Sequence, residues 1–529
     1  MSPFRPVFPL ASPRLSRRSF LGASSSMLVA LSAGRAWSNE PMVRERPSFQ
    51  AYPFQLGVAS GDPSADGFVL WTRLAPEPLI GGGMPHEAVW VHWQVAEDEA
   101  MTKVVASGKE IASPDWAHSV HVEVTGLKPD RWYWYQFKAG AEVSQRGRSR
   151  TLERTDRPAI ETSPLKMSFA SCQHFEAGFF TAYQHMLAEN PDIVFHLGDY
   201  IYEGPSRDGQ VRRHNSAEIM TLDDYRNRHA QYKTDLSLQA MHAAAPWVVT
   251  WDDHEVDNNY AGDIPEEKGP MELQDFLMRR AAAYQAYYEH MPLRTACIPK
   301  GAGMKLYRSV RHGGLVDFHV LDTRQYRTDQ PNHDKPGPAS MDPNATLMGG
   351  IQREWLLGEL KNSHAAWNVL AQQVMMARVS RGRGGREMCS PDQWPGYEVE
   401  RQALLRAFMD LKVSNPVVLT GDIHTHWANE LPVVPTQSDA PIAATEFVCT
   451  SITSKGDGTD HPAGMEAMLS DNPFVKYHGD QRGYVSCVID SKTWRSDFRT
   501  IDYVSRPGAP LKTQASFVVE SGRAALNKA

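Results

Sequence analysis

The 529-residue chain has only five cysteines, and none are spaced as C-x-x-C. The sequence therefore excludes a zinc ribbon, and the odd number leaves at least one thiol unpaired. Beyond the N-terminal region there is no apolar run long enough to span a bilayer, so we expect the mature protein to be soluble. Basic residues are not in excess, since 55 Lys and Arg face 62 Asp and Glu, a formal net charge of −7. We therefore expect no stable nucleic-acid or membrane partner.

Acidic residues are missing from the first 39 positions, which hold five arginines. Arg17 and Arg18 precede a mildly apolar run, Phe20–Ala33, that ends among small residues. This pattern predicts a twin-arginine signal peptide over residues 1–36, the twin-arginine export machinery as a partner, and a periplasmic or secreted location. Cleavage near Ala36 removes five positive charges, so 50 − 62 gives −12 for the mature chain. Because this route exports folded proteins, a cofactor can be loaded before export.

Residues 52–150 have the pattern of short β-strands. Apolar and polar side chains alternate at 89–95 and 119–124, and an aromatic run occupies 132–137. The turn at 126–130 followed by a strand-borne tyrosine resembles the tyrosine corner of immunoglobulin-type sandwiches. We therefore predict an N-terminal β-sandwich over residues 52–150.

After a polar linker at 146–164, strands alternate with helices. This pattern predicts an α/β domain with a mixed sheet over residues 165–505, followed by a C-terminal extension, 506–529. The predicted strands are 166–170, 192–197, 248–250, 367–374 and 417–420, the predicted helices 179–187, 271–290, 352–364 and 398–411, and β-hairpins are predicted at 484–504.

Four of the predicted strands are followed directly by residue types that commonly bind metals. In open α/β sheets the ligand crevice lies beyond the carboxyl ends of the strands. Four strand ends that carry Asp, His, Asn or Cys therefore indicate one convergent site. Four ionisable groups in succession at 252–255 also resist burial unless they are paired or bind a metal. The clusters are Ser171-Cys172-Gln173-His174, Gly198-Asp199-Tyr200-Ile201-Tyr202-Glu203, Asp252-Asp253-His254-Glu255 with Asn258 and Asn259, and Gly421-Asp422-Ile423-His424.

These segments resemble the PhoD-type alkaline phosphatase/phosphodiesterase family. The motifs are A-S-C-Q, G-D-Y-I-Y-E, W-D-D-H-E-V-D-N-N and G-D-I-H-T-H-W, and residues 54–63 and 69–73 are similar to that family's N-terminal β-domain. More distantly, the arrangement is similar to the calcineurin-like metallophosphoesterase superfamily. The resemblance covers nearly the whole mature chain and implies a four-layer α/β/β/α catalytic domain.

The resemblance implies Fe(3+) held by Cys172, Asp199, Tyr202 and His424, with Ca(2+) completing the site. Hard Fe(3+) suits phenolate and carboxylate and keeps a bound thiol deprotonated. Strand alternation does not choose between Tyr200 and Tyr202, and Tyr202 is taken from the family motif. Calcium prefers six to eight oxygens. These can come from Asp199, Asp252 or Asp253, Asn258 or Asn259, and Asp422, with the choice within each adjacent pair left open.

For catalysis, we predict that His254 contacts the phosphate and protonates the leaving oxygen, with Glu255 orienting it. Asp253 stands where the superfamily usually has Asn, and the extra carboxylate suits a calcium-type ion. Arg228, within the basic segment 225–229, is the predicted guanidinium contact to phosphate, although a solvated helix face explains that segment as well.

The predicted function is an exported, metal-dependent hydrolase that cleaves phosphate monoesters and diesters at alkaline pH, by attack of a metal-bound hydroxide on phosphorus. The alternative enzyme is a calcium-dependent phosphodiesterase of phospholipase D-like activity, whose metal ligands look alike in sequence. Two further hypotheses remain. In one, Cys172 is the nucleophile of the reaction, and in the other, the protein binds a surface and its metal site is vestigial. The basic segment 378–386 is either a recruiting surface for anionic substrate or a plain surface loop.

Overall fold

The computed structural model describes residues 43–266, 271–331, 335–382, 386–437, 439–460, 462 and 464–529. All of them belong to one compact unit, Val43–Ala529. The predicted signal peptide, residues 1–36, lies outside the described residues. Within the described part of the chain, no helix combines the length and apolar character needed to cross a membrane.

The larger sheet has ten strands in the order β22-β21-β20-β19-β9-β10-β11-β1-β2-β5. The central strands β9, β10, β11 and β1 run parallel to one another, and the strands on both sides pair antiparallel. The bounds are β1 (Val58–Gly61), β2 (Phe68–Arg73), β5 (Ser119–Val124), β9 (Leu165–Ala170), β10 (Ile193–Leu197), β11 (Pro246–Thr250), β19 (Arg482–Ile489), β20 (Thr493–Ile501), β21 (Leu511–Glu520) and β22 (Asn527–Lys528).

A second sheet of seven strands has the order β12-β13-β14-β15-β17-β16-β18. Its central strands β13, β14, β15 and β17 are parallel. The bounds are β12 (Arg308–His312), β13 (Val316–Val320), β14 (Trp367–Ala371), β15 (Pro416–Thr420), β16 (His426–Pro432), β17 (Ile442–Val448) and β18 (Val475–Gly479).

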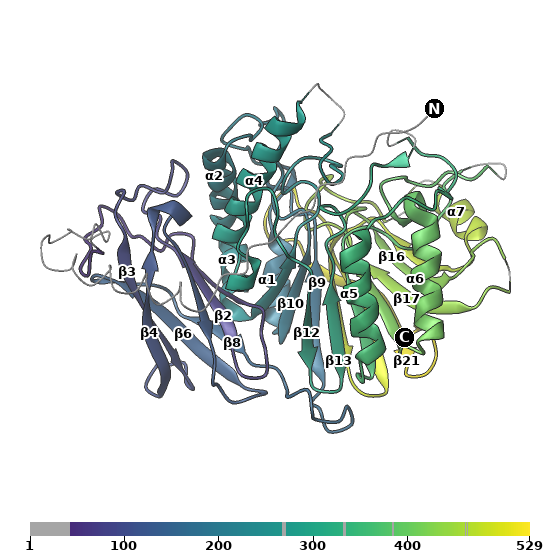
Figure 1. Ribbon diagram of the computed structural model, residues 1–529, viewed down its shortest axis with the longest axis horizontal. Helices are drawn as coiled ribbons and strands as arrows, with labels where there is room; N and C mark the ends of the chain where they lie inside the picture. The colour runs from purple at the N-terminus through teal and green to yellow at the C-terminus, as the bar shows by residue number, and fades with distance from the viewer. Residues whose placement is uncertain are drawn as a thin grey trace, which may run out of the picture. The chain divides into compact units, whose positions relative to one another are not determined.

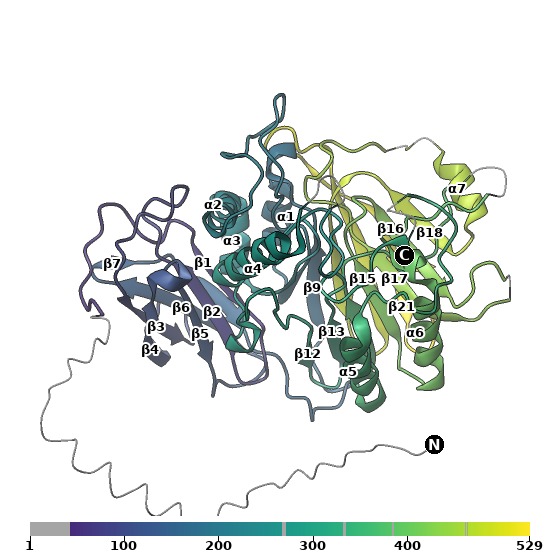
Figure 2. The same cartoon turned by 45° about the horizontal axis from the view of Figure 1, so that its top comes forward.

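The two sheets pack face to face, and helices cover both outer faces (Figures 1 and 2). Apolar side chains from both sheets form one buried cluster, in which the Phe195 and Phe318 rings lie 4.6 Å apart. Helices α1–α4 pack on the ten-stranded sheet, and α5 and α6 pack on the seven-stranded sheet. The predicted four-layer α/β/β/α arrangement is confirmed. The helices are α1 (Thr181–Glu189), α2 (Leu222–Lys233), α3 (Leu236–Ala244), α4 (Leu273–His290), α5 (Gly349–Asn362), α6 (Glu398–Asp410) and α7 (Met465–Asp471).

The N-terminal region forms the predicted sandwich. A small sheet of β4 (Val104–Ala112), β3 (Val89–Ala96), β6 (Trp132–Ala139) and β7 (Glu142–Val143), with β8 (Gly147–Arg150) paired to β6, packs on β1, β2 and β5. The tyrosine corner is present, because the Lys128 amide donates to Tyr133 Oη at 3.0 Å. The sandwich shares a sheet with the rest of the chain, since β1 pairs with β11 at the register Ser60 to Pro246.

The C-terminal segment, expected as an extension over 506–529, is part of the large sheet. β21 pairs with β20 along its length, and β22 pairs with β21. Ala515, Phe517 and Val519 alternate along β21 and are buried between the two sheets. Their period of two is that of a half-buried strand, which accounts for the mixed character of the segment.

Candidate metal centre

The four predicted strand-end clusters meet where the two sheets face each other. β9, β10 and β11 are neighbours in the large sheet, and β15 belongs to the second sheet. The segments that follow them are joined by backbone hydrogen bonds: the Cys172 amide donates to the Gly198 carbonyl, and the Gln173 amide to the Asp199 carbonyl, both at 3.1 Å. Side chains 27 to 252 positions apart in the sequence therefore lie within one site.

The backbone is strained at the residues that carry these side chains. Cys172, Asp199, Asp422 and His424 have φ angles of 58°, 56°, 61° and 63°. A residue other than glycine pays about 1–2 kcal/mol for such a left-handed conformation. Strain of this kind persists where the surrounding structure dictates it, and it is concentrated at functional sites.

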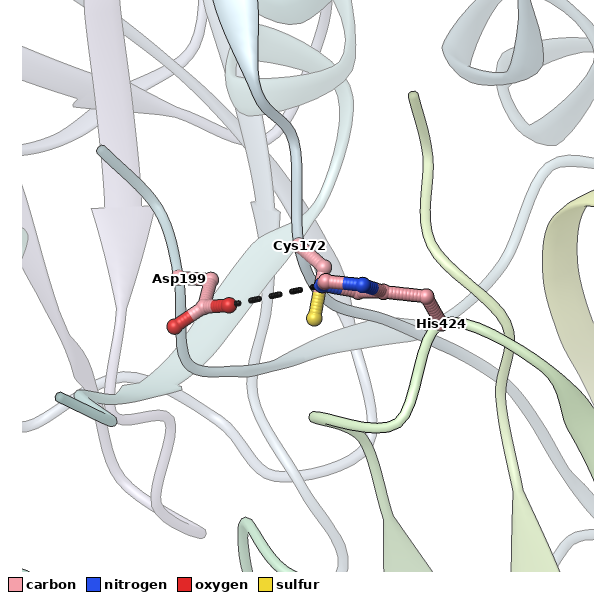
Figure 3. A group of neighbouring side chains, drawn as sticks. All are labelled: Cys172, Asp199 and His424. Carbon is pink, nitrogen blue, oxygen red and sulfur yellow. Dashed lines mark ion pairs between the residues drawn. The ribbon is translucent and has the colours of Figure 1, made fainter. Parts of the chain in front are cut away.

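The side chains of Cys172, Asp199 and His424 point toward one another (Figure 3), and with Tyr202 they form the first cluster. Potential ligand atoms of the cysteine, aspartate and histidine all lie within 4.8 Å of one another. Tyr202 Oη lies 2.8 Å from Asp199 Oδ2 and 3.2 Å from His424 Nε2. Tyr200 points elsewhere, with its hydroxyl 2.8 Å from His242 Nε2. Of the two tyrosines left open by strand alternation, the structure therefore brings Tyr202 to the cluster.

The chemistry of this cluster fits a bound cation. Burial, with the charge of Asp199 adding to it, raises the pKa of Cys172 and of Tyr202 well above their ordinary values. Burial also raises the pKa of Asp199 well above its ordinary value, and the charge of His254 offsets this only in part. Asp199 Oδ1 and His424 Nδ1 are buried without a hydrogen-bond partner. A metal ion both satisfies such orphaned atoms and favours the deprotonated thiol, phenol and carboxyl groups.

A second group, Asp199, Asp253 and His254, also brings its ligand atoms within 4.8 Å of one another. His254 Nδ1 lies 2.7 Å from Glu203 Oε2, and the Asn258 amide donates to Glu203 Oε1 at 3.0 Å. Burial lowers the pKa of His254, but the negative charges of Glu203, Asp253 and Asp199 outweigh burial and raise it well above 6.5. The surrounding carboxylates therefore favour the protonated form of His254.

The remaining predicted carboxylates surround a buried arginine. The Arg324 guanidinium contacts Asp252 through Nε, bonds Asp392 in bidentate fashion at 2.7 and 2.9 Å, and lies 3.6 Å from Asp253 and 3.8 Å from Asp422. Burial raises the pKa of Asp253, but the charges of Arg324 and His254 bring it down to about 2. Asp422 has a pKa of about 6 because burial and Asp392 outweigh Arg324. One buried cation thus already compensates part of this negative charge.

The two asparagines differ in their contacts. Asn258 directs its side chain amide to Glu266 Oε1 at 2.8 Å and lines the pocket described below. Asn259 donates its backbone amide to Asp253 Oδ2 at 2.8 Å, and its carbonyl accepts from Gln330 Nε2. Their backbone amides thus fix Glu203 and Asp253, which flank His254.

A pocket of about 1230 Å³ opens beside the cluster. Tyr202, His254 and His424 line it together with His174, so both candidate metal-binding groups are reached from this pocket. Most of the further lining residues are polar or charged, among them Arg207, Asp257, Arg279, Ser454, Lys455 and Asp457, and the apolar ones include Val211, Met220 and Met271.

Comparison with known proteins returns one family for both halves of the chain. The profile described as PhoD-like phosphatase matches residues 167–498, and that of the PhoD-like phosphatase N-terminal domain matches residues 38–153. The chain belongs to the PhoD-like phosphatase family. It is 50% identical over 515 residues to alkaline phosphatase D of Bacillus subtilis (strain 168), covering 96% of this chain and 87% of that protein. A solved structure, described as the structure of PhoD, matches with a TM-score of 0.88 at 51% identity, covering 91% of this chain and 93% of that one.

Arg228 does not reach the pocket of this PhoD-like phosphatase, contrary to the sequence-based prediction. Its guanidinium is fully buried and donates to the carbonyls of Tyr202, Gly204 and Ala217 and to Ser216 Oγ. The basic segment lies on α2, and its arginine faces inward rather than toward substrate. Arg228 fixes the loop that carries Tyr202 instead.

Glu255 is also placed differently from the prediction. Its carboxylate accepts the backbone amides of Asp199, Tyr200 and Asp252, so it ties two strand ends together. Glu203 is the residue that contacts His254. Sequence reasoning had included Glu203 only as the last residue of its motif, without giving it a role.

Arg324 and Asp392 of the PhoD-like phosphatase were missed altogether. Arg324 follows β13, which ends at Val320, and so obeys the same strand-end rule as the four clusters. Recognising β13 in the sequence would have drawn attention to the segment 321–324. Asp392 lies in a loop, and no sequence signal marks it.

Proposed function

We propose that this PhoD-like phosphatase hydrolyses phosphate monoesters and diesters at alkaline pH in a metal-dependent reaction, after export through the twin-arginine route to the periplasm or the medium. The observation that carries the proposal is the convergence of Cys172, Asp199, Tyr202 and His424 beside a pocket of about 1230 Å³. A thiol, a carboxyl, a phenol and an imidazole have no common role in apolar packing. Their common chemistry is metal binding.

The residues present support iron in the first cluster. Cys172, Asp199, Tyr202 and His424 would hold Fe(3+), since phenolate and carboxylate suit a hard, highly charged ion. Asp422 and either Asp252 or Asp253, with Asp199 and the nearby Asn258 and Asn259, are the oxygen donors proposed for Ca(2+). Asp252 pairs with Arg324 through Oδ1 but leaves Oδ2 buried without a hydrogen-bond partner, so the choice between Asp252 and Asp253 stays open. When bound, the ions would neutralise phosphoryl oxygens and lower the pKa of a bound water.

His254 supplies the proton for the leaving group in this proposal. It lines the pocket, lies beside Asp199 and Asp253, and carries a raised pKa. A histidine with its ordinary pKa of about 6.5 would be deprotonated at alkaline pH and unable to act as an acid. Glu203 keeps His254 protonated and oriented, which supports activity on the alkaline side of neutrality.

The pocket volume favours diester capacity as well as monoester hydrolysis. A cavity of about 1230 Å³ has room for a second substituent on phosphorus. The alternative is a calcium-dependent diesterase. Comparing the hydrolysis rates of p-nitrophenyl phosphate and bis-p-nitrophenyl phosphate in one preparation distinguishes it from the proposed enzyme. A diester rate with negligible monoester rate would favour the alternative.

The test compares two equally buried cysteines in exported protein. Cys172→Ala should lose bound iron and at least about a hundredfold of the activity, because it removes a ligand of the proposed centre. Cys487→Ala is the matched control, since Cys487 is also 1% exposed but lies in the core between the sheets. Elemental analysis should find iron and calcium in the wild-type protein and iron in the control.

Zinc as the sole metal, or a Cys172→Ala protein with full iron content and activity, would overturn the proposed centre. Unchanged biological effect of an inactive Asp199→Asn protein would instead favour a binding role. For the proposed location, we expect a strain without twin-arginine export to retain the unprocessed precursor of this protein in the cytoplasm.

A further inference from the structure

A phosphate ester brings one or two negative charges into a pocket whose side chains already carry many acids. Two of these acids, Asp257 and Glu218, pair with Arg279, at 2.9 and 3.1 Å. Glu203 pairs with His254. Arg279 is thus committed to pocket carboxylates and Arg228 is buried elsewhere, so neither guanidinium is placed to contact the substrate. Arg207 and Lys455 are the other lysine or arginine side chains on the described pocket wall.

Lys455 lies in a tight turn at the metal-binding cluster. The Gly456 amide donates to the Thr453 carbonyl at 2.9 Å, which closes a turn with Ser454 and Lys455 at its centre. Lys455 has a φ of 71°, the left-handed value that position i+2 of such a turn usually assigns to glycine or asparagine. A lysine at this position is strained, and strain of this kind is a mark of functional sites.

The turn is fastened to the cluster by three side-chain contacts. Ser454 Oγ lies 2.7 Å from Tyr202 Oη and donates to the Cys172 carbonyl at 2.8 Å. Thr453 Oγ1 donates to the His174 carbonyl at 2.8 Å. The position of Lys455 is therefore fixed relative to the residues proposed to bind metal.

Lys455 lines the pocket beside His424 and Ser454, and it forms no salt bridge with an acidic side chain in the described part of the chain. The nearby Asp457 is engaged elsewhere, since its Oδ1 accepts the amides of Val504 and Ser505 and its Oδ2 accepts the Ser505 hydroxyl. The Arg207 guanidinium lies toward Gly204, since a Cβ added at Gly204 would be 3.9 Å from Arg207 Nη2.

We propose that Lys455 is a substrate-binding residue whose ammonium contacts a non-bridging oxygen of the phosphoryl group at the mouth of the metal centre. This inference rests on the proposed phosphoric ester hydrolysis and adds a protein cation to it. A lysine binds phosphate as a compact point charge, so the contact favours a dianionic monoester over a monoanionic diester.

The test replaces Lys455 by Asn, which removes the charge but tolerates the left-handed backbone. Lys455→Asn in the metal-loaded enzyme should raise KM for p-nitrophenyl phosphate about tenfold with little change in kcat, as expected for loss of one charge-assisted contact. KM for bis-p-nitrophenyl phosphate should rise less. Lys455→Arg should keep KM within about threefold of wild type, because the charge is retained.

Lys412→Asn is the matched control. Lys412 is an exposed lysine with a φ of 53°, and it lines no part of the pocket. Its replacement removes the same charge and relieves the same kind of backbone strain, so KM should stay at the wild-type value. Melting temperatures of both Asn variants should equal or exceed that of wild type.

Calorimetric binding of inorganic phosphate gives a readout that does not depend on turnover. Lys455→Asn should weaken phosphate binding about tenfold, and raised salt should shrink the difference from wild type. Equal phosphate affinity and equal KM in Lys455→Asn and wild type would overturn the inference, as would a loss confined to kcat. If the wild type hydrolyses neither ester, the proposed function fails, and the phosphate titration still decides whether Lys455 binds the anion.

Discussion

Among the carboxylates that raise the pKa of His254, Glu203 has the largest influence and is the one in direct contact with it. Its Oε2 lies 2.7 Å from His254 Nδ1, and its other oxygen is fixed by the Asn258 amide. Burial alone would lower the pKa of His254, and it is the surrounding carboxylates that raise it. The raised pKa that the proposed acid role of His254 requires thus comes from the neighbouring carboxylates and not from the imidazole itself.

Glu203→Gln tests this at the residue scale. Removal of the negative charge lowers the pKa of His254, so the protonated form is lost at a lower pH. The alkaline limb of the kcat profile should therefore move to lower pH, and kcat should fall about 10–100-fold. Glu218→Gln is the control, because Glu218 lines the same pocket but pairs with Arg279. An alkaline limb that stays in place would contradict the role given to Glu203.

At the scale of elements, the loops after β10 and β11 approach each other closely behind the site. Gly198 directly follows β10 and has a φ of +104°. A Cβ added there would lie 2.4 Å from Asp252 Cβ and 2.7 Å from the Asp252 backbone nitrogen. Glycine at this position lets the two strand ends meet, and Asp199 and Asp253 are brought together as a result.

Gly198→Ala should destabilise the fold by about 2–4 kcal/mol, through overpacking and backbone strain together. It should also lower activity by displacing Asp199. Gly126→Ala provides the control, because Gly126 has a φ of +79° but open space around its Cβ position. Its cost should be limited to the backbone, about 1 kcal/mol. Urea unfolding measures both, and equal losses in the two variants would show that the close approach has no effect.

At the scale of the whole molecule, four buried histidines link stability to pH. His196 on β10, His229 on α2, His242 on α3 and His290 on α4 are buried between the large sheet and its helices. Burial lowers the pKa of His196 to about 3 and the pKa of the other three well below 6.5. Below pH 6.5 the unfolded chain therefore binds protons that the folded chain does not.

Stability should consequently fall as the pH falls below 6.5. Each such histidine contributes a loss of about 1.4 kcal/mol between pH 7.5 and 5.5. His229→Gln should reduce the difference between urea midpoints at these two pH values, since glutamine does not titrate. His92→Gln, at an exposed histidine of β3, should leave that difference unchanged. A wild-type midpoint that is the same at both pH values would contradict the linkage.

Some residues of the candidate site were predictable from the sequence and others were not. Strand ends followed by Asp, His and Cys could be recognised because each cluster is local, and Tyr202 was chosen from the family motif. Glu203 and Lys455 gave no local signal of their roles, and Arg324 was overlooked because β13 was not predicted. The carboxylate and imidazole partners lie 51 or more positions away for Glu203 and 68 or more for Arg324. The predicted contact between Arg228 and phosphate was wrong, because the charge of a residue does not reveal which side of its helix is buried.

By itself the sequence determined the fold class, the strand ends that carry the chemistry, and the family. These follow from period, turn residues and motifs that are read within about ten positions. The tertiary structure alone decided that the N-terminal sandwich shares the large sheet, that residues 511–528 complete that sheet, and that Arg324 lies among four carboxylates. Such features depend on long-range packing, where the burial of each charge is balanced by a partner that no local pattern specifies.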